Sequence, residues 1–169
     1  MSPLKERVRQ ALHEEVVIVP YDRCWAARYR REAARLRRMF GSRLIRRIEH
    51  FGSTAVPGLA AKPIIDMLVE VPSLRAAKLD VAPVLCAAGY EYFWRPTFGD
   101  NVPPWYAFFI KRNRKGERTH HIHMVTCPRV FQEHWDRLLF RDYLVANPKF
   151  SRKYANLKRR LANEHPKIG

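Results

Sequence analysis

The segment from Ile64 to Val71, "IIDMLVEV", constrains the fold of this chain more than any other. It is a short and nearly continuous apolar run, and it follows a loop with two prolines and a glycine. Such a run is typical of a β-strand buried on both faces, because a strand with one solvated face alternates apolar and polar residues. We therefore expect a sheet covered by helices. Asp66 lies in the middle of this run, which makes it the first candidate functional residue.

Stretches before this strand predict alternating helices and strands. A Ser-Pro pair is a start signal for a short helix over 3–14, and the β-branched run "EVVIVPY" after it predicts a strand. Asp22 is suited to cap a long helix that reaches about Phe40, where Gly41 can end it. The next segment, "RLIRRIEHFGS", returns to a strand.

Stretches after the strand predict one helix, three strands and a helical end. The helix runs from Ser73 to Gly89, and Pro83 interrupts or kinks it. Three aromatic or β-branched runs follow, "YEYFWRP", "PWYAFFIKR" and "THHIHMVTC", and the polar "NRKGE" between the last two suits a hairpin. A helical region over 128–165 ends the chain, and an Asn-Pro pair divides it.

This order of elements places the chain in the α+β class. We predict a mixed, largely antiparallel β-sheet flanked by helices. With 169 residues, of which 47% are apolar, the chain is long enough for one domain with a full core. It contains no internal repeat and no Gly/Ser-rich linker. We therefore expect residues 1–169 to form a single domain.

The charge of the chain is strongly positive, with 32 Lys and Arg against 16 Asp and Glu and a formal net charge of +16. Such a surface attracts anions, so we expect a nucleotide or another phosphate-bearing ligand. The arginine-rich segment from Arg28 to Phe40 is more typical of a solvated helix face than of a nucleic-acid groove, because no clear patch of aromatic residues alternates with the arginines. Nucleic acid stays an alternative partner.

The first residues contain no apolar signal region, and no window approaches ~18 uninterrupted apolar residues. We therefore expect a cytoplasmic protein that does not interact with membranes.

Gly52 and Ser53 follow the strand that precedes Asp66. A glycine turn lets backbone N–H groups and a hydroxyl approach a phosphate closely, and Asp66 comes about a dozen residues later on the neighbouring strand. This layout resembles that of the nucleotidyltransferases of the polymerase-β superfamily. In those enzymes the Gly-Ser turn holds a triphosphate, and carboxylates on the next strand bind Mg²⁺.

A longer stretch, "IEHFGSTAVPGLAAKPIIDMLVEV", together with "THHIHMV", closely resembles the GrpB family of small bacterial proteins. That family is assigned to the nucleotidyltransferase fold and is sometimes fused to dephospho-CoA kinase, and the resemblance covers Val16 to the C-terminus. It implies a nucleotidyltransferase-like sheet with a phosphate turn at Gly52 and Ser53 and a metal-site acid at Asp66. From the sequence alone we expect Lys62 to be a solvated loop lysine, whereas the resemblance implies that it lies near the ligand. The resemblance implies no settled reaction.

The expected metal site departs from the superfamily pattern. Superfamily enzymes place two acids at D-x-D spacing, but the second position here is Leu68. Glu70 shares a strand face with Asp66 but lies about 13 Å away, too far to bind the same ion. His121 and His123 share one face of their strand, about 7 Å apart, and can complete a site with Asp66.

An aspartate with two histidines suits Mn²⁺ or Zn²⁺ better than Mg²⁺, and we expect a divalent cofactor, Mg²⁺ or Mn²⁺. The alternative that one histidine belongs to the core and the other caps a polar pocket is equally good. Histidine-triad hydrolases also use closely spaced strand histidines, but Val125 stands where their third histidine belongs.

Three hypotheses about function stay open. The first is a metal-dependent nucleotidyltransferase with Asp66, His121 and His123 as catalytic and metal-binding residues, and Gly52, Ser53 and Lys62 on the nucleotide phosphates. The second is a non-catalytic nucleotide- or phosphate-binding module, for which Leu68 is the argument. The third is a basic nucleic-acid-binding protein.

Overall fold

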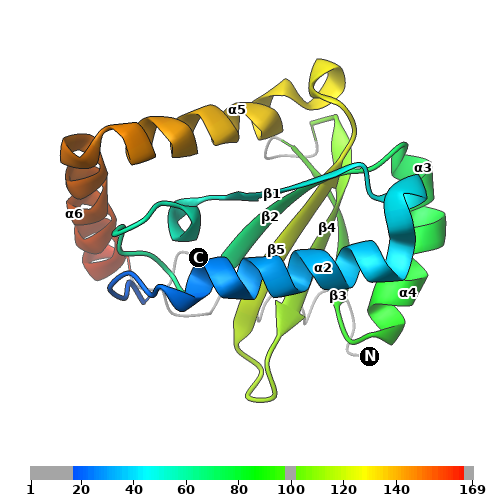
Figure 1. Ribbon diagram of the computed structural model, residues 1–169, viewed down its shortest axis with the longest axis horizontal. Helices are drawn as coiled ribbons and strands as arrows, with labels where there is room; N and C mark the ends of the chain where they lie inside the picture. Colours follow the sequence, from blue (N-terminus) through cyan, green and yellow to red (C-terminus); the bar gives the residue numbers. More distant parts are fainter. Residues whose placement is uncertain (1–16, 98–101, 166–169) are drawn as a thin grey trace.

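A five-stranded β-sheet forms the centre of the computed structural model, which describes residues 17–97 and 102–165 (Figure 1). The sheet order is β1-β2-β5-β4-β3. Strands β2 and β5 are parallel, and all other neighbours are antiparallel. The predicted mixed, largely antiparallel sheet is therefore confirmed. The strands are β1 (Arg47–Phe51), β2 (Ile65–Glu70), β3 (Glu91–Pro96), β4 (Trp105–Arg112) and β5 (Arg118–Val125).

Helices cover both faces of this sheet, as expected for an α+β fold. Helix α2 (Cys24–Leu44) crosses one face, together with α3 (Leu74–Ala76) and α4 (Ala82–Ala87) (Figure 1). Helix α5 (Pro128–Ala146) covers the other face, and α6 (Pro148–Glu164) turns away from it beyond the edge of the sheet. No helix in the described ranges is both long enough and apolar enough to cross a membrane.

Strand β2 is buried on both faces, which explains its nearly continuous apolar sequence. Ile65, Met67 and Val69 belong to the core under α2. Leu68 points the other way, into the core under α5. Asp66 shares that second face but lies near the start of the strand, where its side chain is 28% exposed. The charged group therefore reaches solvent from an otherwise buried strand.

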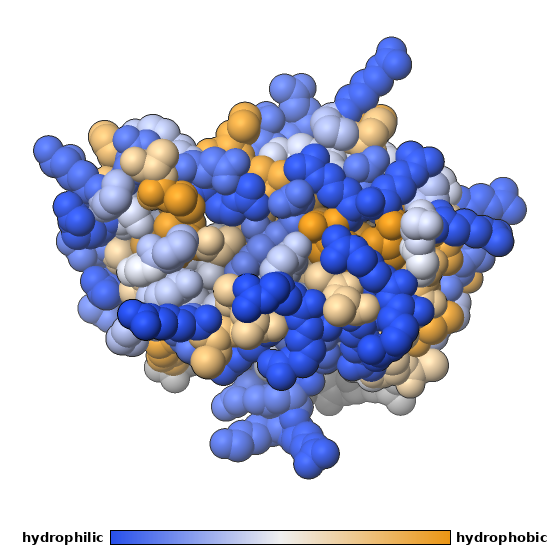
Figure 2. Space-filling model, in the orientation of Figure 1, coloured by the Kyte–Doolittle hydropathy of each residue, from blue (hydrophilic) through white to orange (hydrophobic). Residues whose placement is uncertain are grey.

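Helix α2 follows its sequence signals closely. The Asp22 carboxylate accepts a hydrogen bond from the Cys24 N–H at 2.8 Å, which caps the first turn. Gly41 interrupts the helical geometry with φ 61° and ψ −177°, and one further turn ends at Leu44. The apolar face points inward, whereas hydrophilic side chains cover the outward face in Figure 2. This arrangement agrees with a solvated arginine face.

The helix predicted from Ser73 to Gly89 is interrupted ahead of its proline, as expected. The Ser73 hydroxyl accepts a hydrogen bond from the Ala76 N–H at 3.0 Å, which caps α3. A π-helical turn over Ala77–Val81 then leads into α4, where Pro83 lies in the first turn. The Ala82 N–H donates to the Ala77 carbonyl, five residues back, and Pro83 follows with no N–H to place in the helix.

The strand predicted from "EVVIVPY" is wrong for the part that the structure describes. Val19 forms only an isolated antiparallel bridge with Ala61. The pairing cannot extend in either direction, because Pro63 has no N–H and the Leu59 N–H already bonds to the Val56 carbonyl at 3.2 Å. The predicted helix over 3–14 lies outside the described residues. The region predicted as helical over 128–165 contains α5 and α6.

Candidate functional site

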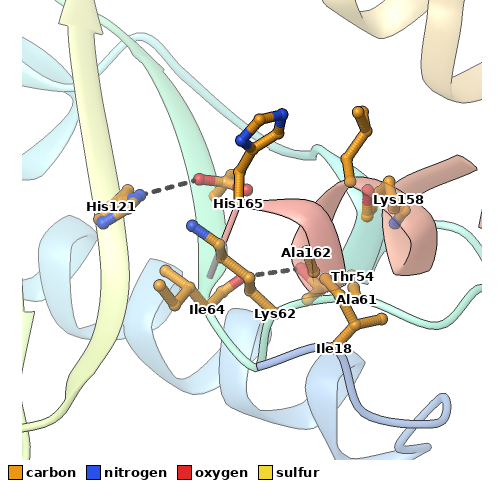
Figure 3. Close-up of a pocket in the computed structure, with 12 residues that line it drawn as sticks. Ile18, Thr54, Ala61, Lys62, Ile64, His121, Lys158, Ala162 and His165 are labelled. Atoms are coloured by element: carbon orange, nitrogen blue, oxygen red, sulfur yellow. Dashed lines mark hydrogen bonds and ion pairs between the residues drawn. The ribbon is translucent and has the colours of Figure 1, made fainter. Parts of the chain in front are cut away.

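A cavity of about 410 Å³ opens between one end of the sheet and helix α6 (Figure 3). Four of the predicted site residues line it, namely Ser53, Lys62, Asp66 and His121. They come from the turn after β1, the loop before β2, β2 itself and β5. The other lining residues are Ile18, Thr54, Ala61, Ile64, Lys158, Leu161, Ala162 and His165.

The Gly-Ser turn lies directly above Asp66. Antiparallel pairing of β1 with β2 places Phe51 opposite Asp66, so the chain turns at Gly52 just as it passes the carboxylate. Gly52 has φ 71° and ψ −172°, a conformation essentially restricted to glycine. The short 3₁₀ turn Ser53–Ala55 follows, and it brings Ser53 to the wall of the cavity. The predicted adjacency of the turn and the acid is confirmed.

The Asp66 carboxylate and the His121 imidazole face each other across the parallel strands β2 and β5. They are register partners, and Asp66 Oδ1 lies 3.3 Å from His121 Nδ1. Their side chains are 28% and 18% exposed. The other ring nitrogen of His121, Nε2, is buried without a hydrogen-bond partner in the described part of the chain. The polar atoms that this pair offers to a ligand in the cavity are therefore the Asp66 carboxylate oxygens and the adjoining His121 Nδ1 atom.

His123 does not join this pair. It is the register partner of Leu68, one pair further along the sheet, and its ring stacks on Tyr106 at 5.6 Å. Only 7% of His123 is exposed. Burial lowers its pKa well below 6.5, and the positive charges of neighbouring histidine and arginine side chains add to this effect.

The predicted set of Asp66, His121 and His123 is therefore not assembled around one ion. Same-face neighbours on a strand are about 7 Å apart, and α5 covers the part of the sheet where His123 lies. No three His, Cys, Asp or Glu side chains in the described ranges are grouped to hold a metal ion. His123 is buried and stacked on Tyr106, an environment that agrees with the alternative of a core histidine.

Two donors for a divalent ion are nevertheless present. The 3.3 Å separation of Asp66 Oδ1 and His121 Nδ1 is close to the roughly 3 Å between neighbouring ligands of an ion with bonds of about 2.1 Å. Mg²⁺ is often held by one or two carboxylates and otherwise by substrate phosphates and water. This donor set fits an ion that arrives with a phosphate-bearing ligand better than a permanently bound one.

Helix α6 forms the wall of the cavity opposite the sheet. Figure 3 shows Lys158, Ala162 and His165 across from His121. The Lys158 ammonium donates a hydrogen bond to the Ala60 carbonyl at 2.6 Å. Burial, with a smaller contribution from the Arg159 charge, lowers the pKa of Lys158 to about 8. The cavity thus holds a lysine that loses its proton much closer to neutral pH than usual.

Lys158 and Thr54 also line the cavity, although no sequence pattern predicted either of them as a site residue. No local signal links α6 to the Gly-Ser turn, because the two are about ninety residues apart and meet only through tertiary packing. Thr54, by contrast, directly follows the Gly-Ser pair. Its hydroxyl donates to the Ile64 carbonyl at 3.2 Å and lies 3.1 Å from His50 Nε2. It ties the turn to the start of β2.

The sequence model of the GrpB protein family matches residues 15–168. The chain belongs to the GrpB family. A solved relative, described as the conserved protein GrpB from Enterococcus faecalis, superposes with a TM-score of 0.75 at 35% identity. The match covers 89% of this chain and 85% of that chain. The resemblance seen in the Gly-Ser, Asp66 and histidine segments is therefore confirmed, and so is the fold.

Two curated relatives extend this comparison. The UPF0157 protein YqkA of Bacillus subtilis is 41% identical over 152 residues, which cover 90% of this chain and 41% of YqkA. The glutamate-rich protein GrpB of Alkalihalophilus pseudofirmus is 35% identical over 154 residues, which cover 90% of this chain and 84% of the relative. The chain thus spans less than half of YqkA and most of the second protein. The second match agrees with membership of the GrpB family.

Proposed function

We propose that this GrpB-family protein binds a nucleoside triphosphate with a divalent metal ion and transfers its nucleotidyl group to an acceptor. The observation that carries this proposal is the convergence of the Gly52–Ser53 turn, Lys62 and the Asp66–His121 pair on one cavity. In the superfamily that the sequence resembles, a Gly-Ser turn holds the triphosphate and acids on the next strand hold the metal ion; this chain has the turn and one of those acids, with Leu68 in place of the second.

The phosphate end of the nucleotide is assigned to the turn and the lysines. Gly52 gives close backbone access, and the Ser53 hydroxyl can donate to a phosphate oxygen. Lys62 and Lys158 bring positive charge from opposite sides of the cavity, which suits the several negative charges of a triphosphate. Burial of Lys158 strengthens this attraction, since charges interact more strongly where water is excluded.

The metal ion is assigned to Asp66, with His121 beside it. Such an ion neutralises phosphate charge and lowers the cost of the negative charge that develops during transfer. Asp66 carries the formal negative charge of the pair, and the 3.3 Å contact with His121 fixes its orientation. His121 is therefore a positioning residue for the carboxylate, and a second ligand through Nδ1 when it is neutral.

The remaining wall of the cavity is apolar and suits a nucleobase or ribose. Ile18 and Ile64 lie on one side, and Leu161 and Ala162 come from α6. A flat base can pack against such side chains, and the phosphates then point toward the lysines. The volume of about 410 Å³ lies within the usual range for a small-ligand site.

The test is metal-dependent release of pyrophosphate from each common nucleoside triphosphate. With water in place of the unidentified acceptor, the products are the nucleoside monophosphate and pyrophosphate, and we expect slow release by the unaltered protein with Mg²⁺ or Mn²⁺ and a loss of about a hundredfold in Asp66→Asn. Glu70→Gln is the matched control, because it makes the same chemical change further along the same strand face. Release that is unchanged in Asp66→Asn would contradict the proposal.

A non-catalytic nucleotide-binding module is the second candidate, and Leu68 favours it. This residue occupies the place of the second superfamily acid, is fully buried and packs in the core under α5. An acid there could not reach the cavity without unpacking the helix. Tight, Asp66-dependent binding of metal and nucleotide with no pyrophosphate release would identify the protein as such a module.

A further inference from the structure

A second cavity, of about 570 Å³, lies on the other side of Lys62. Lys62 and Ile64 line both this cavity and the candidate site, so the two are neighbours across one short loop. Its walls come from the first turns of α2, from residues 62–64 and from the turn between β4 and β5. The lining residues are Val17, Arg28, Lys62, Pro63, Ile64, Asn113, Lys115, Gly116, Glu117, Arg118 and Thr119.

Four of these side chains are cationic, and they come from three separate elements: Arg28 from α2, Lys62 from the loop, and Lys115 and Arg118 from the hairpin. Glu117 is the acid among the described residues that line the cavity, and its carboxylate accepts a hydrogen bond from the Asn113 amide at 2.6 Å. Positive charge therefore dominates the cavity. Cations gathered in this way repel one another, and an anion bound among them removes that repulsion.

Two of the four cationic groups, those of Arg28 and Lys115, keep much of their capacity for a ligand. Arg28 lies 3.4 Å from Asp22, but both side chains are about 40% exposed, and an ion pair so accessible to water is weak. The Lys115 ammonium has no acidic partner within residues 17–97 and 102–165. A phosphate could therefore bind the Arg28 guanidinium and the Lys115 ammonium without breaking a strong interaction within the protein.

The hairpin that carries two of the cations is held in one conformation by its own hydrogen bonds. The Asn113 side-chain carbonyl accepts from the N–H groups of Lys115 and Glu117 at 2.9 and 3.0 Å. The Arg112 guanidinium donates to the Gly116 carbonyl at 2.7 Å. A turn fixed in this way presents its basic residues with little ordering cost on binding. Hydrophilic side chains cover the hairpin where it projects from the molecule (Figures 1 and 2).

We propose that this cavity is a second phosphate-binding subsite and that it takes a phosphate group of the acceptor. The acceptor is then itself a small phosphate-bearing molecule, and the two substrates meet at Lys62. This assignment of the acceptor rests on the proposed nucleotidyl transfer, whereas the anion site is testable without it. The candidate site would hold the nucleotide, and the acceptor would approach from the hairpin side of the loop.

The test is titration of inorganic pyrophosphate into the whole protein, followed by amide chemical shifts and by calorimetry. We expect two groups of shifts, one at Gly52, Ser53 and Asp66 and one over 113–119. Lys115→Met should weaken the binding that the second group reports by about fivefold or more. Arg114→Met is the matched control, because Arg114 lies in the same turn and has the same charge but does not line the cavity. This control should leave the affinity nearly unchanged.

Two results would overturn the proposal. Equal weakening by Lys115→Met and Arg114→Met would show general attraction to a basic surface, and shifts confined to Gly52, Ser53 and Asp66 would show that pyrophosphate binds only at the candidate site. The Asp66→Asn variant separates this outcome from failure of the proposed function. This variant should abolish metal-dependent nucleotide binding and should leave the chemical-shift changes over 113–119 in place. The amide signals near each site therefore report binding at that site alone.

Discussion

Gly52 lies so close to Asp66 that a methyl group at Gly52 would come within 2.5 Å of the Asp66 Oδ2 atom and 3.2 Å of its Cβ atom. The glycine is required for a second reason, because its backbone has φ 71° and ψ −172°. The Gly-Ser turn and the acid are thus one structural unit. The turn passes over the carboxylate at a distance that only a residue without a side chain allows.

Gly52→Ala should therefore destabilise the fold and disturb the site together. We expect a loss of roughly 2–5 kcal/mol in the free energy of unfolding, from backbone strain and from the clash with Asp66. Gly58→Ala is the control, because Gly58 has φ 78° but no atom within 4 Å of the added methyl group. It should cost only about 1–2 kcal/mol. Urea denaturation of both variants measures this difference, and equal losses would mean that the contact with Asp66 is unimportant.

Lys158 should give nucleotide binding a pH dependence near 8. Its pKa is lowered to about 8 by burial, so the side chain loses its positive charge as the pH rises from 7 to 9. We expect the affinity for Mg²⁺-ATP to fall over that range, and we expect Lys158→Met to bind more weakly at pH 7 with little further change. Lys153→Met, on an exposed position of the same helix, should keep the unaltered profile. A Lys158→Met profile like that of the parent would exclude this role.

Buried His134 should make the protein less stable in acid. It is fully buried with no hydrogen-bond partner for either ring nitrogen in the described part of the chain, and burial lowers its pKa to about 4. Between pH 6.5 and about 4 the unfolded chain binds a proton that the folded chain does not, so stability falls as the pH falls. The shift from 6.5 to about 4 corresponds to roughly 3 kcal/mol.

His134→Leu should remove that part of the pH dependence. At pH 7 the change should be neutral or stabilising, because an apolar side chain of similar size replaces an unpaired polar ring. At pH 5 the variant should exceed the parent by about 1–2 kcal/mol, since part of the proton uptake is complete there. Urea denaturation at both pH values tests this expectation. An advantage that is no larger at pH 5 than at pH 7 would show that His134 does not titrate as described.

Much of the fold followed from local patterns. The run Ile64 to Val71 indicated the interior strand β2, because a strand buried on both faces has a nearly continuous apolar sequence. The hairpin at 113–117 followed from its turn residues. The bridge at Val19 did not follow, because the residues that stop the pairing, Leu59 and Pro63, lie in another part of the chain.

The candidate site was predictable to the extent that strand geometry determines it. Pairing of neighbouring strands brought Asp66 to the Gly-Ser turn and to His121. The alternation of side chains placed His123 on the same face, but which part of that face α5 covers depends on helix packing. The position of Lys158 could not be predicted for the same reason. The direction of α6 after Asn147 depends on tertiary packing, such as that of Leu144 with Ala155 and Val56.

The affinity of Mn²⁺ for the protein with and without ATP, measured through the paramagnetic relaxation that Mn²⁺ causes, tests most directly whether the cavity binds a metal ion together with a nucleotide. With one carboxylate and one imidazole at the site, we expect weak Mn²⁺ binding alone and binding at least about tenfold tighter with ATP. The relaxation should centre on Gly52, Asp66 and His121, and Asp66→Asn should abolish it, whereas Glu70→Gln should not. Mn²⁺-ATP binding that is undiminished in Asp66→Asn, or relaxation centred elsewhere, would show that Asp66 does not hold the metal ion.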